Sequence, residues 1–305
     1  MTILVGSESR ILVQGITGTT GRLFAEKMMA HGTPLVGGVT PGKGGEVLAG
    51  VPVFNSMREA VAATGANAVL SCIAPQFVMD GIFEVVDAGI PLVCLYIENI
   101  PVHDAIRMCA YAEARGTRML GPNSAGVVSP GRANMSDLND NNMRPGRIGI
   151  VSKSGTLTYE VIDELHRHGH GESTVVCLGG DRVIGTDYAE VLSLFEDDPD
   201  TDLVVVIGEP GGGLEYAAVA QAVGMRTPVL AYITGQGSPP DARMGHAGAV
   251  VGDDARSRPQ NKMQAFSSAG IAVARLVTDV GALVTQTLER TARTSSQRHP
   301  QEKPS

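Results

Sequence analysis

The chain has little of several residue types that mark other protein classes. Its 305 residues include no tryptophan, 6 tyrosines, 6 phenylalanines and only 4 cysteines. The cysteines are scattered, without the spacing of a metal site or the density of a disulfide scaffold, which favours a reduced, cytoplasmic setting. No apolar run exceeds about seven residues, whereas a membrane-spanning helix needs ~20. Residues 1–10 lack the apolar segment of a secretory signal.

Charge is scarce as well. Asp, Glu, Lys and Arg make up 18% of the chain, and the net charge is −8. No basic stripe interrupts this acidic balance, so nucleic acid is not expected as a partner. His166, His168 and His170 are the densest group of potential metal ligands. Because Gly169 interrupts their helix and no carboxylate accompanies them at ligand spacing, we predict a solvated helix end and no metal site.

Glycine and short apolar runs are abundant. The 38 glycines exceed the ~7% of an average protein, and 43% of the residues are hydrophobic. Apolar runs alternate with helical segments, a pattern typical of a parallel, doubly wound α/β fold. The predicted strands are 11–14, 34–39, 68–73, 92–97, 118–120, 148–151, 175–178, 203–207, 229–233 and 271–277. The predicted helices are 22–31, 77–88, 102–115, 154–166, 188–195 and 280–288.

The pattern divides the chain into two domains. A weakly periodic segment rich in Pro, Gly and Asn, residues 129–146, is predicted to be an interdomain connection. The first domain is expected to span 1–128 and the second 147–289. The polar segment 290–305 is predicted to be a disordered tail. In each domain we expect ligands at the carboxyl ends of the parallel strands.

A glycine turn follows the first predicted strand. Gly15, Gly18 and Gly21 are spaced G-x-x-G-x-x-G, and the backbone N–H groups of such a turn bind phosphate together with the helix behind it. The spacing departs from the G-x-G-x-x-G nicotinamide fingerprint. No acid follows the second strand to bind a ribose hydroxyl, and Lys43 lies in a glycine-rich loop there instead. These features favour a phosphorylated ribose, as in coenzyme A or NADP; a plain tight turn and a solvated lysine are the alternatives.

His246 lies in a loop of small residues, which leaves its imidazole accessible. An imidazole titrates near neutrality and can act as a nucleophile. Glu209 follows the strand at 203–207, and His246 lies in the loop that leaves the next strand, 229–233. The two are therefore predicted to meet beyond neighbouring strand ends, where the carboxylate would fix the tautomer of the imidazole. An idle loop histidine and a turn carboxylate are the alternatives.

The helix predicted at 154–166 begins with Ser154, Gly155 and Thr156. Serine at this position caps free N–H groups, and the same open N–H groups would hold an anion. A serine hydrolase needs glycine two residues before its nucleophile, where this chain has Ser152. That spacing argues against a nucleophilic serine.

Three segments together resemble the α subunit of succinyl-CoA synthetase: GGVTPGKGG at 37–45, VSKSGTLTYE at 151–160 and MGHAGA at 244–249. The resemblance implies a Rossmann-like CoA-binding domain followed by a flavodoxin-like ligase domain. It implies that a nucleoside triphosphate phosphorylates His246, in a scheme that includes an acyl phosphate, and that Glu209 orients the imidazole. Nucleotide binding belongs to a separate subunit in this family. The resemblance therefore implies an ATP-grasp β subunit that carries ATP or GTP with Mg, in an αβ or α2β2 assembly.

The resemblance also assigns binding residues. Tyr159 matches a position assigned to the carboxylate substrate, a small dicarboxylic acid. The helix start at Ser154, Gly155 and Thr156 would stabilise the phosphohistidine. The positions implied for coenzyme A are Thr17, Gly18, Thr19, Thr20, Lys43, Tyr96, Ile97 and Glu98.

The chain departs from the family pattern at several positions. Family members usually have cysteine and then, in succinate enzymes, proline at the domain junction, where this chain has Ser124 and Ala125. Alanine is closer to malate–CoA ligases, and we expect both residues at the acid pocket. Arg182, the segment 135–143 and the segment 238–242 also differ from the usual pattern.

Formation of succinyl-CoA is the default interpretation, with malate or another dicarboxylate as the alternative acid. A non-catalytic CoA-binding regulatory subunit is a second hypothesis, against which the intact histidine loop argues. An NADP oxidoreductase is a third, but the sequence shows no constellation for hydride transfer.

Overall fold

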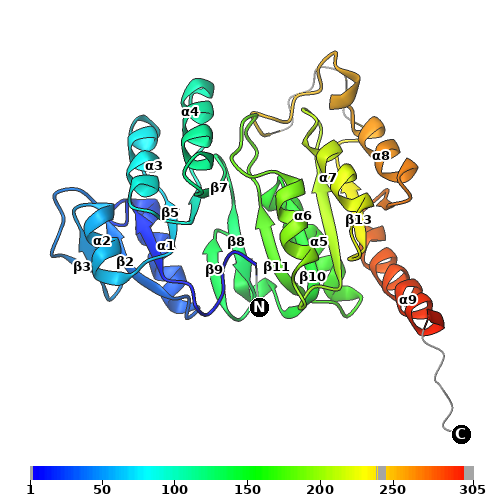
Figure 1. Cartoon of the computed structure of the whole chain (residues 1–305), viewed down its shortest axis with the longest axis horizontal. Helices are drawn as coiled ribbons and strands as arrows, with labels where there is room; N and C mark the ends of the chain where they lie inside the picture. The colour runs from blue at the N-terminus through cyan, green and yellow to red at the C-terminus, as the bar shows by residue number, and fades with distance from the viewer. Residues whose placement is uncertain (1–2, 238, 240–244, 299–305) are drawn as a thin grey trace, which may run out of the picture.

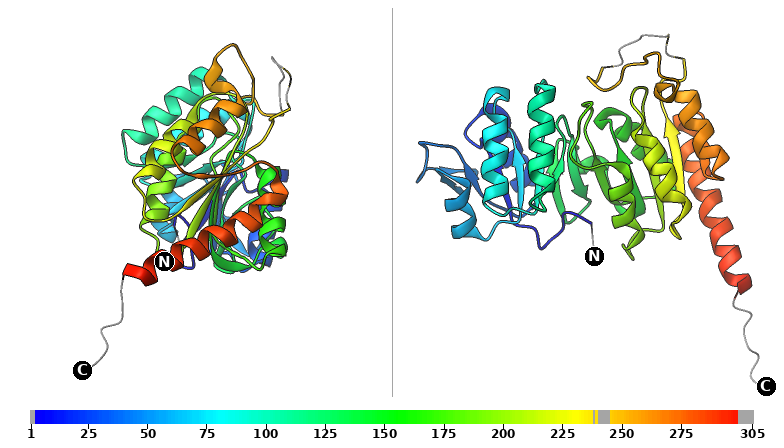
Figure 2. Two further views of the ribbon diagram at one scale, coloured as in Figure 1. Left: turned by 90° about the vertical axis from the view of Figure 1, so that its right-hand side faces the viewer. Right: turned by 45° about the horizontal axis from the view of Figure 1, so that its top comes forward.

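The structure is a computed structural model that describes residues 3–237, 239 and 245–298 (Figure 1). Two α/β halves lie side by side along the long axis of the molecule, and α9 (Val280–Arg298) lies at the far end of the second half (Figures 1 and 2). Each half is built on its own mainly parallel sheet. The predicted α/β class is confirmed.

The strands of the first sheet are β1 (Ile11–Gln14), β2 (Leu35–Val39), β3 (Val47–Leu48), β4 (Val51–Phe54), β5 (Ala68–Ser71), β6 (Leu92–Leu95) and β7 (Arg118–Leu120). Their order is β3-β4-β2-β1-β5-β6-β7. The central strands β1, β5 and β6 are buried along their whole length, as expected for short apolar runs in a parallel sheet. The hairpin of β3 and β4 was not predicted, because its first strand is only two residues long. Ala49 (φ 50°) and Gly50 (φ 79°) form its tight turn.

The strands of the second sheet are β8 (Gly126–Ser129), β9 (Ala133–Ser136), β10 (Pro145–Ser152), β11 (Glu172–Cys177), β12 (Leu203–Gly208), β13 (Val229–Ile233) and β14 (Ala272–Ala274). Their order is β14-β13-β12-β10-β11-β8-β9. The five strands from β14 to β11 are parallel, whereas β8 and β9 form an antiparallel edge. The carboxyl ends of β10, β12 and β13 therefore meet at one end of the sheet.

The helices of the first half are α1 (Thr19–Ala30), α2 (Met57–Thr64), α3 (Val78–Asp87) and α4 (Val102–Glu113). Those of the second half are α5 (Gly155–Arg167), α6 (Tyr188–Glu196), α7 (Leu214–Val223), α8 (Pro259–Ser268) and α9. Short 3-10 helices lie at η1 (Pro75–Phe77), η2 (Asp140–Asn142), η3 (Ala255–Ser257) and η4 (Val277–Asp279). Three helices, α2, α7 and α8, were not predicted. The last of them is rich in Gln, Asn and Ser, which hides its helical period.

Residues 129–146, predicted as an interdomain connection, are largely ordered. They contain β9 and the start of β10, and the β8–β9 hairpin pairs with β11 through β8. The hairpin also contacts the first half. Ser129 Oγ donates to the carbonyl of Val5 (2.8 Å), and the N–H of Asn134 donates to Thr33 Oγ1 (3.0 Å). The polar residues that hid this strand pattern are thus satisfied where the two halves meet.

The C-terminal helix α9 continues past residue 289. Residues 290–298, predicted to belong to a disordered tail, are helical, and 299–305 lie outside the described residues. No glycine or proline stands between Gly281 and Pro300 to end the helix. Glu289 and Arg293 form an i,i+4 ion pair at 3.6 Å, which supports the extension.

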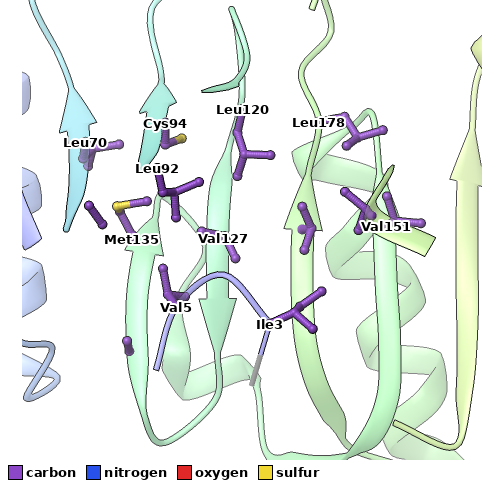
Figure 3. Close-up of a cluster of buried hydrophobic side chains, with 14 of the residues drawn as sticks. Ile3, Val5, Leu70, Leu92, Cys94, Leu120, Val127, Met135, Val151 and Leu178 are labelled. Carbon is purple, nitrogen blue, oxygen red and sulfur yellow. The ribbon is translucent and has the colours of Figure 1, made fainter. Parts of the chain in front are cut away.

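One cluster of buried apolar side chains joins the two halves (Figure 3). Val127 of β8 and Met135 of β9 belong to it, together with Leu120 of β7 and Val151 of β10. Ile3, from the N-terminal segment, is part of the same cluster. The hydrophobic effect therefore holds the halves in a fixed relation, which the functional groups at their junction require.

Among the helices in the described part of the chain, none combines the length and the apolar character that a bilayer crossing needs.

We predict that Met135→Ala destabilises the protein by about 2–5 kcal/mol, because Met135 is fully buried in the shared cluster and truncation leaves a cavity. Urea unfolding of the isolated chain measures the change. The control is Val223→Ala, since Val223 is 66% exposed and its truncation should cost little. Equal midpoints for the two variants would show that the shared core does not hold the halves together.

Candidate active site

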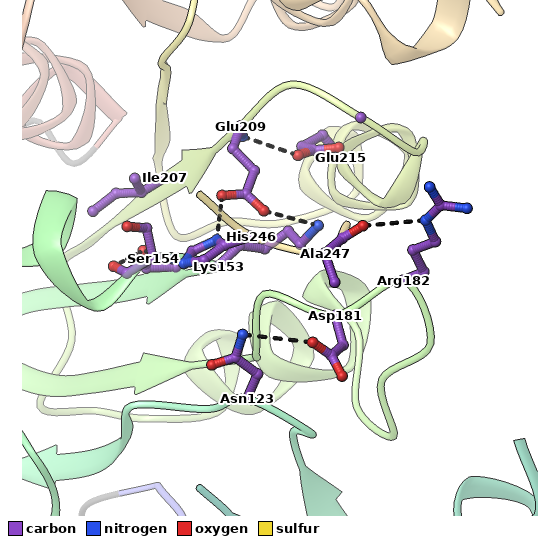
Figure 4. Close-up of polar contacts among 12 residues, drawn as sticks. Asn123, Lys153, Ser154, Asp181, Arg182, Ile207, Glu209, Glu215, His246 and Ala247 are labelled. Carbon is purple, nitrogen blue, oxygen red and sulfur yellow. Dashed lines mark hydrogen bonds and ion pairs between the residues drawn. The ribbon is translucent and has the colours of Figure 1, made fainter. Parts of the chain in front are cut away.

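Strand register brings two charged residues to one end of the second sheet. Ser152 of β10 pairs with Ile207 of β12 in parallel register, and the N–H of Lys153 still bonds to the carbonyl of Ile207 (3.4 Å). Lys153 follows β10 and Glu209 follows β12, so both residues lie beyond the carboxyl ends of adjacent parallel strands (Figure 4). Carboxyl ends of parallel strands are where ligands bind in such sheets.

His246 reaches this end of the sheet from the loop that follows β13. Its Nδ1 lies 2.8 Å from Oε2 of Glu209 (Figure 4). The structure therefore brings together the two residues that the strand order predicted to meet. The carboxylate is buried, whereas the imidazole is 26% exposed, so part of the ring can be reached from solvent.

Small residues and one arginine seat the histidine loop. The N–H of Gly248 donates to the carbonyl of Gly180 (2.9 Å), and a Cβ at position 180 would lie 2.6 Å from the imidazole. Arg182 Nε donates to the carbonyl of Ala247 (3.1 Å). Arg182 stood out in the sequence only as a departure from the family pattern. In the structure it supports the main chain next to His246.

The hydrogen bond between His246 and Glu209 shifts the pKa values of both groups. The hydrogen bond to Glu209 raises the pKa of His246, and burial opposes this only in part. Burial raises the pKa of Glu209, but the hydrogen bond to His246 and the charge of Lys153 outweigh it, so this pKa lies below its usual value. Glu209 stays ionised and accepts the proton on Nδ1. In its neutral form, the imidazole carries its proton on Nδ1 and presents the lone pair of Nε2.

Lys153 is a site residue that the sequence did not reveal. Its Nζ lies 3.2 Å from Oε1 of Glu209, and its side chain is only 4% exposed. A buried lysine next to a buried glutamate is uncommon outside functional or structural ion pairs. Only the strand register, which the sequence pattern cannot supply, would have placed it next to Glu209.

The start of α5 faces the same space. Ser154 is its N-cap, and its Oγ accepts the N–H of Leu157 (3.3 Å), as predicted. Gly155 and Thr156 line a cavity of 550 Å³ together with His246, so the positive end of the helix and the imidazole border the same space. The lining residues are Pro75, Tyr96, Ile97, Glu98, Asn99, Asn123, Ser124, Ala125, Asp137, Lys153, Gly155, Thr156, Tyr159 and His246.

The residues predicted for the acid lie in this cavity, with different exposure. Ser124 is buried, and its hydroxyl donates to the carbonyl of Cys177 (2.5 Å) and accepts from the N–H of Gly126 (3.0 Å). It thus ties the domain junction together. Ala125 and Tyr159 line the wall of the cavity.

Asp137 is a further residue of this wall that the sequence did not single out. Its N–H donates to the carbonyl of Ala125 (2.9 Å), and Tyr159 Oη accepts the N–H of Asn139 (2.6 Å) two residues later. Asp137 itself lines the cavity. The segment after β9 therefore places a carboxylate beside the residues predicted for the acid.

A second cavity, of 750 Å³, lies at the carboxyl ends of β1, β2 and β5. Thr17 and Gly18 line it, next to Thr40 and Pro41. Gly15 has φ 81°, and a Cβ at position 21 would lie 2.2 Å from the carbonyl oxygen of Gly15, so the glycine turn fits only glycine there.

The predicted CoA residues divide between the two cavities. Thr19 and Thr20 form the first turn of α1, behind the glycine turn. Lys43 lies outside the lining of the second cavity and is ion-paired with Glu46 (3.2 Å). Tyr96, Ile97 and Glu98 line the 550 Å³ cavity that contains His246. Ala74 lines one cavity and Pro75 the other, so the two spaces are neighbours along the chain.

The histidines at 166, 168 and 170 have partners of their own. His166 pairs with Glu172 (3.0 Å), His168 Nδ1 contacts the carbonyl of Glu164 (3.0 Å), and His170 contacts Thr285 (2.8 Å). The described residues contain no group of three or more potential ligands close enough to hold a metal ion. Of the divergent segment before His246, positions 238 and 240–244 lie outside the described residues.

Two known protein families match this chain, one in each half. Residues 7–99 match the family described as CoA binding domain. Residues 145–291 match the family described as succinyl-CoA ligase like flavodoxin domain. The predicted order of the two domains is therefore confirmed.

Two solved structures share the fold. ATP citrate lyase from Methanothrix soehngenii, in complex with citrate and coenzyme A, superposes with a TM-score of 0.85 at 22% identity, over 99% of this chain and 53% of that chain. Acetyl-coenzyme A synthetase 1 from Ca. Korarchaeum cryptofilum superposes with a TM-score of 0.74 at 19% identity, over 90% of this chain and 60% of that chain. This chain thus spans little more than half the length of either protein.

Curated relatives match from end to end. The chain is 43% identical over 288 residues to a succinate–CoA ligase [ADP-forming] subunit alpha 2 of Archaeoglobus fulgidus, covering 94% of this chain and 100% of the relative. It is 41% identical over 297 residues to the malate–CoA ligase subunit alpha of Methylorubrum extorquens, covering 96% and 100%. Similarity of this extent shows that the chain belongs to the succinate–CoA ligase α-subunit family.

Proposed function

We propose that the chain is the α subunit of a nucleotide-dependent acid–CoA ligase, which forms an acyl-CoA from a dicarboxylate through a phosphohistidine at His246. The observation that carries the proposal is the contact of His246 with a buried, ionised Glu209. His246 lines the 550 Å³ cavity together with the start of α5. A protein that only binds CoA needs neither the oriented imidazole nor the anion-binding helix end. The proposed function is therefore catalytic.

The site supports phosphoryl transfer to and from Nε2. The lone pair of Nε2 attacks the γ-phosphorus of the nucleoside triphosphate, the N–P bond forms, and the P–O bond to the departing nucleoside diphosphate breaks. Glu209 keeps its hydrogen bond to Nδ1–H and stabilises the positive charge that develops on the ring. The N–H groups at Gly155 and Thr156 would bind the phosphoryl oxygens.

The acid then takes the phosphoryl group. A carboxylate oxygen attacks phosphorus, the N–P bond breaks, and an acyl phosphate forms. The thiol sulfur of CoA attacks the acyl carbon, inorganic phosphate departs, and the thiol proton leaves with it or with water. His246, Ala125 and Tyr159 line one cavity, so an acid bound there would lie next to the phosphohistidine.

We propose that CoA binds across the two neighbouring cavities. The phosphates would contact Thr17, Gly18, Thr19 and Thr20 at the start of α1, where the helix has its positive end. Lys43 would contribute positive charge near the CoA phosphates, at the edge of the 750 Å³ cavity. Tyr96, Ile97 and Glu98 lie in the cavity of His246, where the thiol must arrive.

Nucleotide binding requires another chain in this proposal. The two matched families account for residues 7–99 and 145–291, and neither is named for nucleotide binding. The relatives are named as α subunits. We therefore propose an ATP-grasp β subunit that carries ATP or GTP with Mg, in an αβ or α2β2 complex in the cytoplasm.

Succinate is the default acid, and malate is a specific alternative. Malate–CoA ligase is among the relatives, and Ala125 differs from the proline that the resemblance implies for succinate enzymes at this position. Alanine lacks the ring volume of proline and retains an N–H donor. The cavity wall at Ala125 thus favours acceptance of a hydroxylated acid.

His246→Ala is expected to abolish phosphorylation of this chain, because the proposed acceptor atom is lost. The α/β complex is incubated with γ-labelled ATP and then GTP, and an acid-labile, base-stable label is measured on the α chain. His103→Ala removes an exposed histidine of α4 and should leave labelling unchanged. Stoichiometric label on the His246→Ala chain would disprove the assignment.

Lys43→Ala is expected to raise the KM for CoA roughly 5-fold, since an exposed ion pair contributes at most about 1 kcal/mol. Labelling of His246 by ATP should not change. Glu46→Gln is the matched control: it removes the present partner of Lys43 and leaves the lysine charge, so the KM should not rise. An unchanged KM in Lys43→Ala would return Lys43 to a solvated loop residue.

Ala125→Pro is expected to lower kcat/KM for malate relative to succinate by roughly 10-fold, the effect of a small steric change in an acid pocket. The proline ring would fill space in the wall that Ala125 shares with Tyr159. The comparison uses succinate, malate and longer diacids with both enzymes. A wild-type enzyme that uses succinate alone, together with an unchanged ratio in the variant, would show that this junction does not set specificity.

A further inference from the structure

Four charged side chains lie buried behind His246. Lys153 contacts Glu209 at 3.2 Å, and Lys262 of α8 contacts Glu215 of α7 at 2.6 Å. The N–H of Glu209 also donates to Oε1 of Glu215 (3.2 Å), which links the two ion pairs (Figure 4). Buried charges are costly unless they are paired, so their arrangement next to a reactive imidazole calls for a physical account.

The main chain at Glu209 is held independently of its side chain. Lys262 Nζ donates to the carbonyls of Glu209 (2.7 Å) and Gly211 (2.6 Å). Glu215 accepts the N–H of Glu209, and Lys262 donates to its carbonyl. The ion pair of Lys262 and Glu215 therefore holds both polar groups of the main chain at residue 209. Lys262 thereby has two carbonyls and one carboxylate as partners, and its side chain is fully buried.

The carboxylate of Glu209 is held by a different cation. Its Oε2 accepts from Nδ1 of His246, whereas its Oε1 lies 3.2 Å from Nζ of Lys153. A carboxylate is planar, so fixing one oxygen limits the rotation of the other. Among the described residues, Lys153 and His246 are the basic groups that pair with this carboxylate.

We propose that Lys153 is a positioning residue for the nucleophilic His246 and that it acts through Glu209. The proposal rests on the function proposed above for His246. The ammonium group aligns Oε2 with Nδ1 and keeps Glu209 ionised. Its positive charge also opposes protonation of the imidazole, so that the Nε2 lone pair remains available at lower pH.

Other charged groups near His246 and Glu209 also affect the pKa of His246. Asp181, in the loop after β11, accepts a hydrogen bond from Nδ2 of Asn123 (3.5 Å). Its negative charge favours protonation of His246. Glu98 lines the same cavity. Against these acids, Lys153 is the group that lowers the pKa of His246 through its charge.

The sign of the pH effect follows from this charge. Removing the ammonium removes a repulsion, so the His246–Glu209 pair takes up its proton at a higher pH in Lys153→Met. An imidazolium cannot attack phosphorus, and the acidic limb of labelling should therefore move to higher pH. Glu209→Gln removes the carboxylate that stabilises the imidazolium and should move the limb to lower pH. A purely structural residue would reduce activity without moving the limb.

The direct test is a titration of ring nitrogens by NMR. The α/β complex with ¹⁵N-labelled histidine is compared as wild type, Lys153→Met and Lys153→Arg, with His246→Gln to assign the signals. Wild type should show a proton on Nδ1 and a bare Nε2. In Lys153→Met, the midpoint of the His246 titration should move to higher pH. In Lys153→Arg, which keeps the charge, the midpoint should stay near that of wild type. Lys153→Gln serves as the neutral variant if methionine prevents folding, which circular dichroism shows.

Labelling kinetics provide the second readout. Loss of a charge-assisted contact of ~1.5–3 kcal/mol corresponds to a rate of His246 phosphorylation roughly 10- to 150-fold lower in Lys153→Met. Lys153→Arg should recover most of it. An unchanged midpoint and tautomer in a folded neutral variant would overturn the proposal. Absence of label in wild type would instead refute the proposed function, while the titration still decides the role of Lys153.

Discussion

The carboxylate of Glu209 is the group on which the site depends. It is buried, it is ionised, and each of its oxygens has a basic partner, His246 on one side and Lys153 on the other. Burial raises the pKa of this carboxyl group, and the two basic partners more than offset that shift, so the pKa lies below its usual value. An ionised carboxylate on Nδ1 fixes which ring nitrogen is free, and the chemistry of the imidazole follows from that choice.

The position of this carboxylate is a property of the whole fold. Glu209 directly follows β12 and Lys153 directly follows β10, and the parallel register between the two strands places them side by side. His246 comes from the loop that follows β13, the next strand along the sheet. The other walls of its cavity, Tyr96 and Ala125, come from the first half and the junction, which the shared core holds in place. A site built between halves needs such a core, because a loose junction would separate the groups.

The sequence predicted the α/β class, most strands and the meeting of Glu209 with His246, because short apolar runs and strand order carry that information. It missed the β8–β9 hairpin, since polar residues such as Asn134 pair across the junction and hide the alternation. It missed Lys153 and Asp137 for a related reason. Their roles depend on register and on contacts between distant segments, and neither leaves a local pattern in the sequence.

The buried charges behind His246 are difficult to explain by stability alone. Replacing a buried ion pair with apolar groups of similar size is often neutral or stabilising, so Lys262 and Glu215 are not needed merely to fill the core. Their hydrogen bonds go to the N–H and carbonyl of Glu209, and so to the residue that holds the imidazole. A hydrophobic pair could fill the same volume but could not bond to that main chain. The cost of burying these charges is therefore consistent with fixing one carboxylate in one orientation.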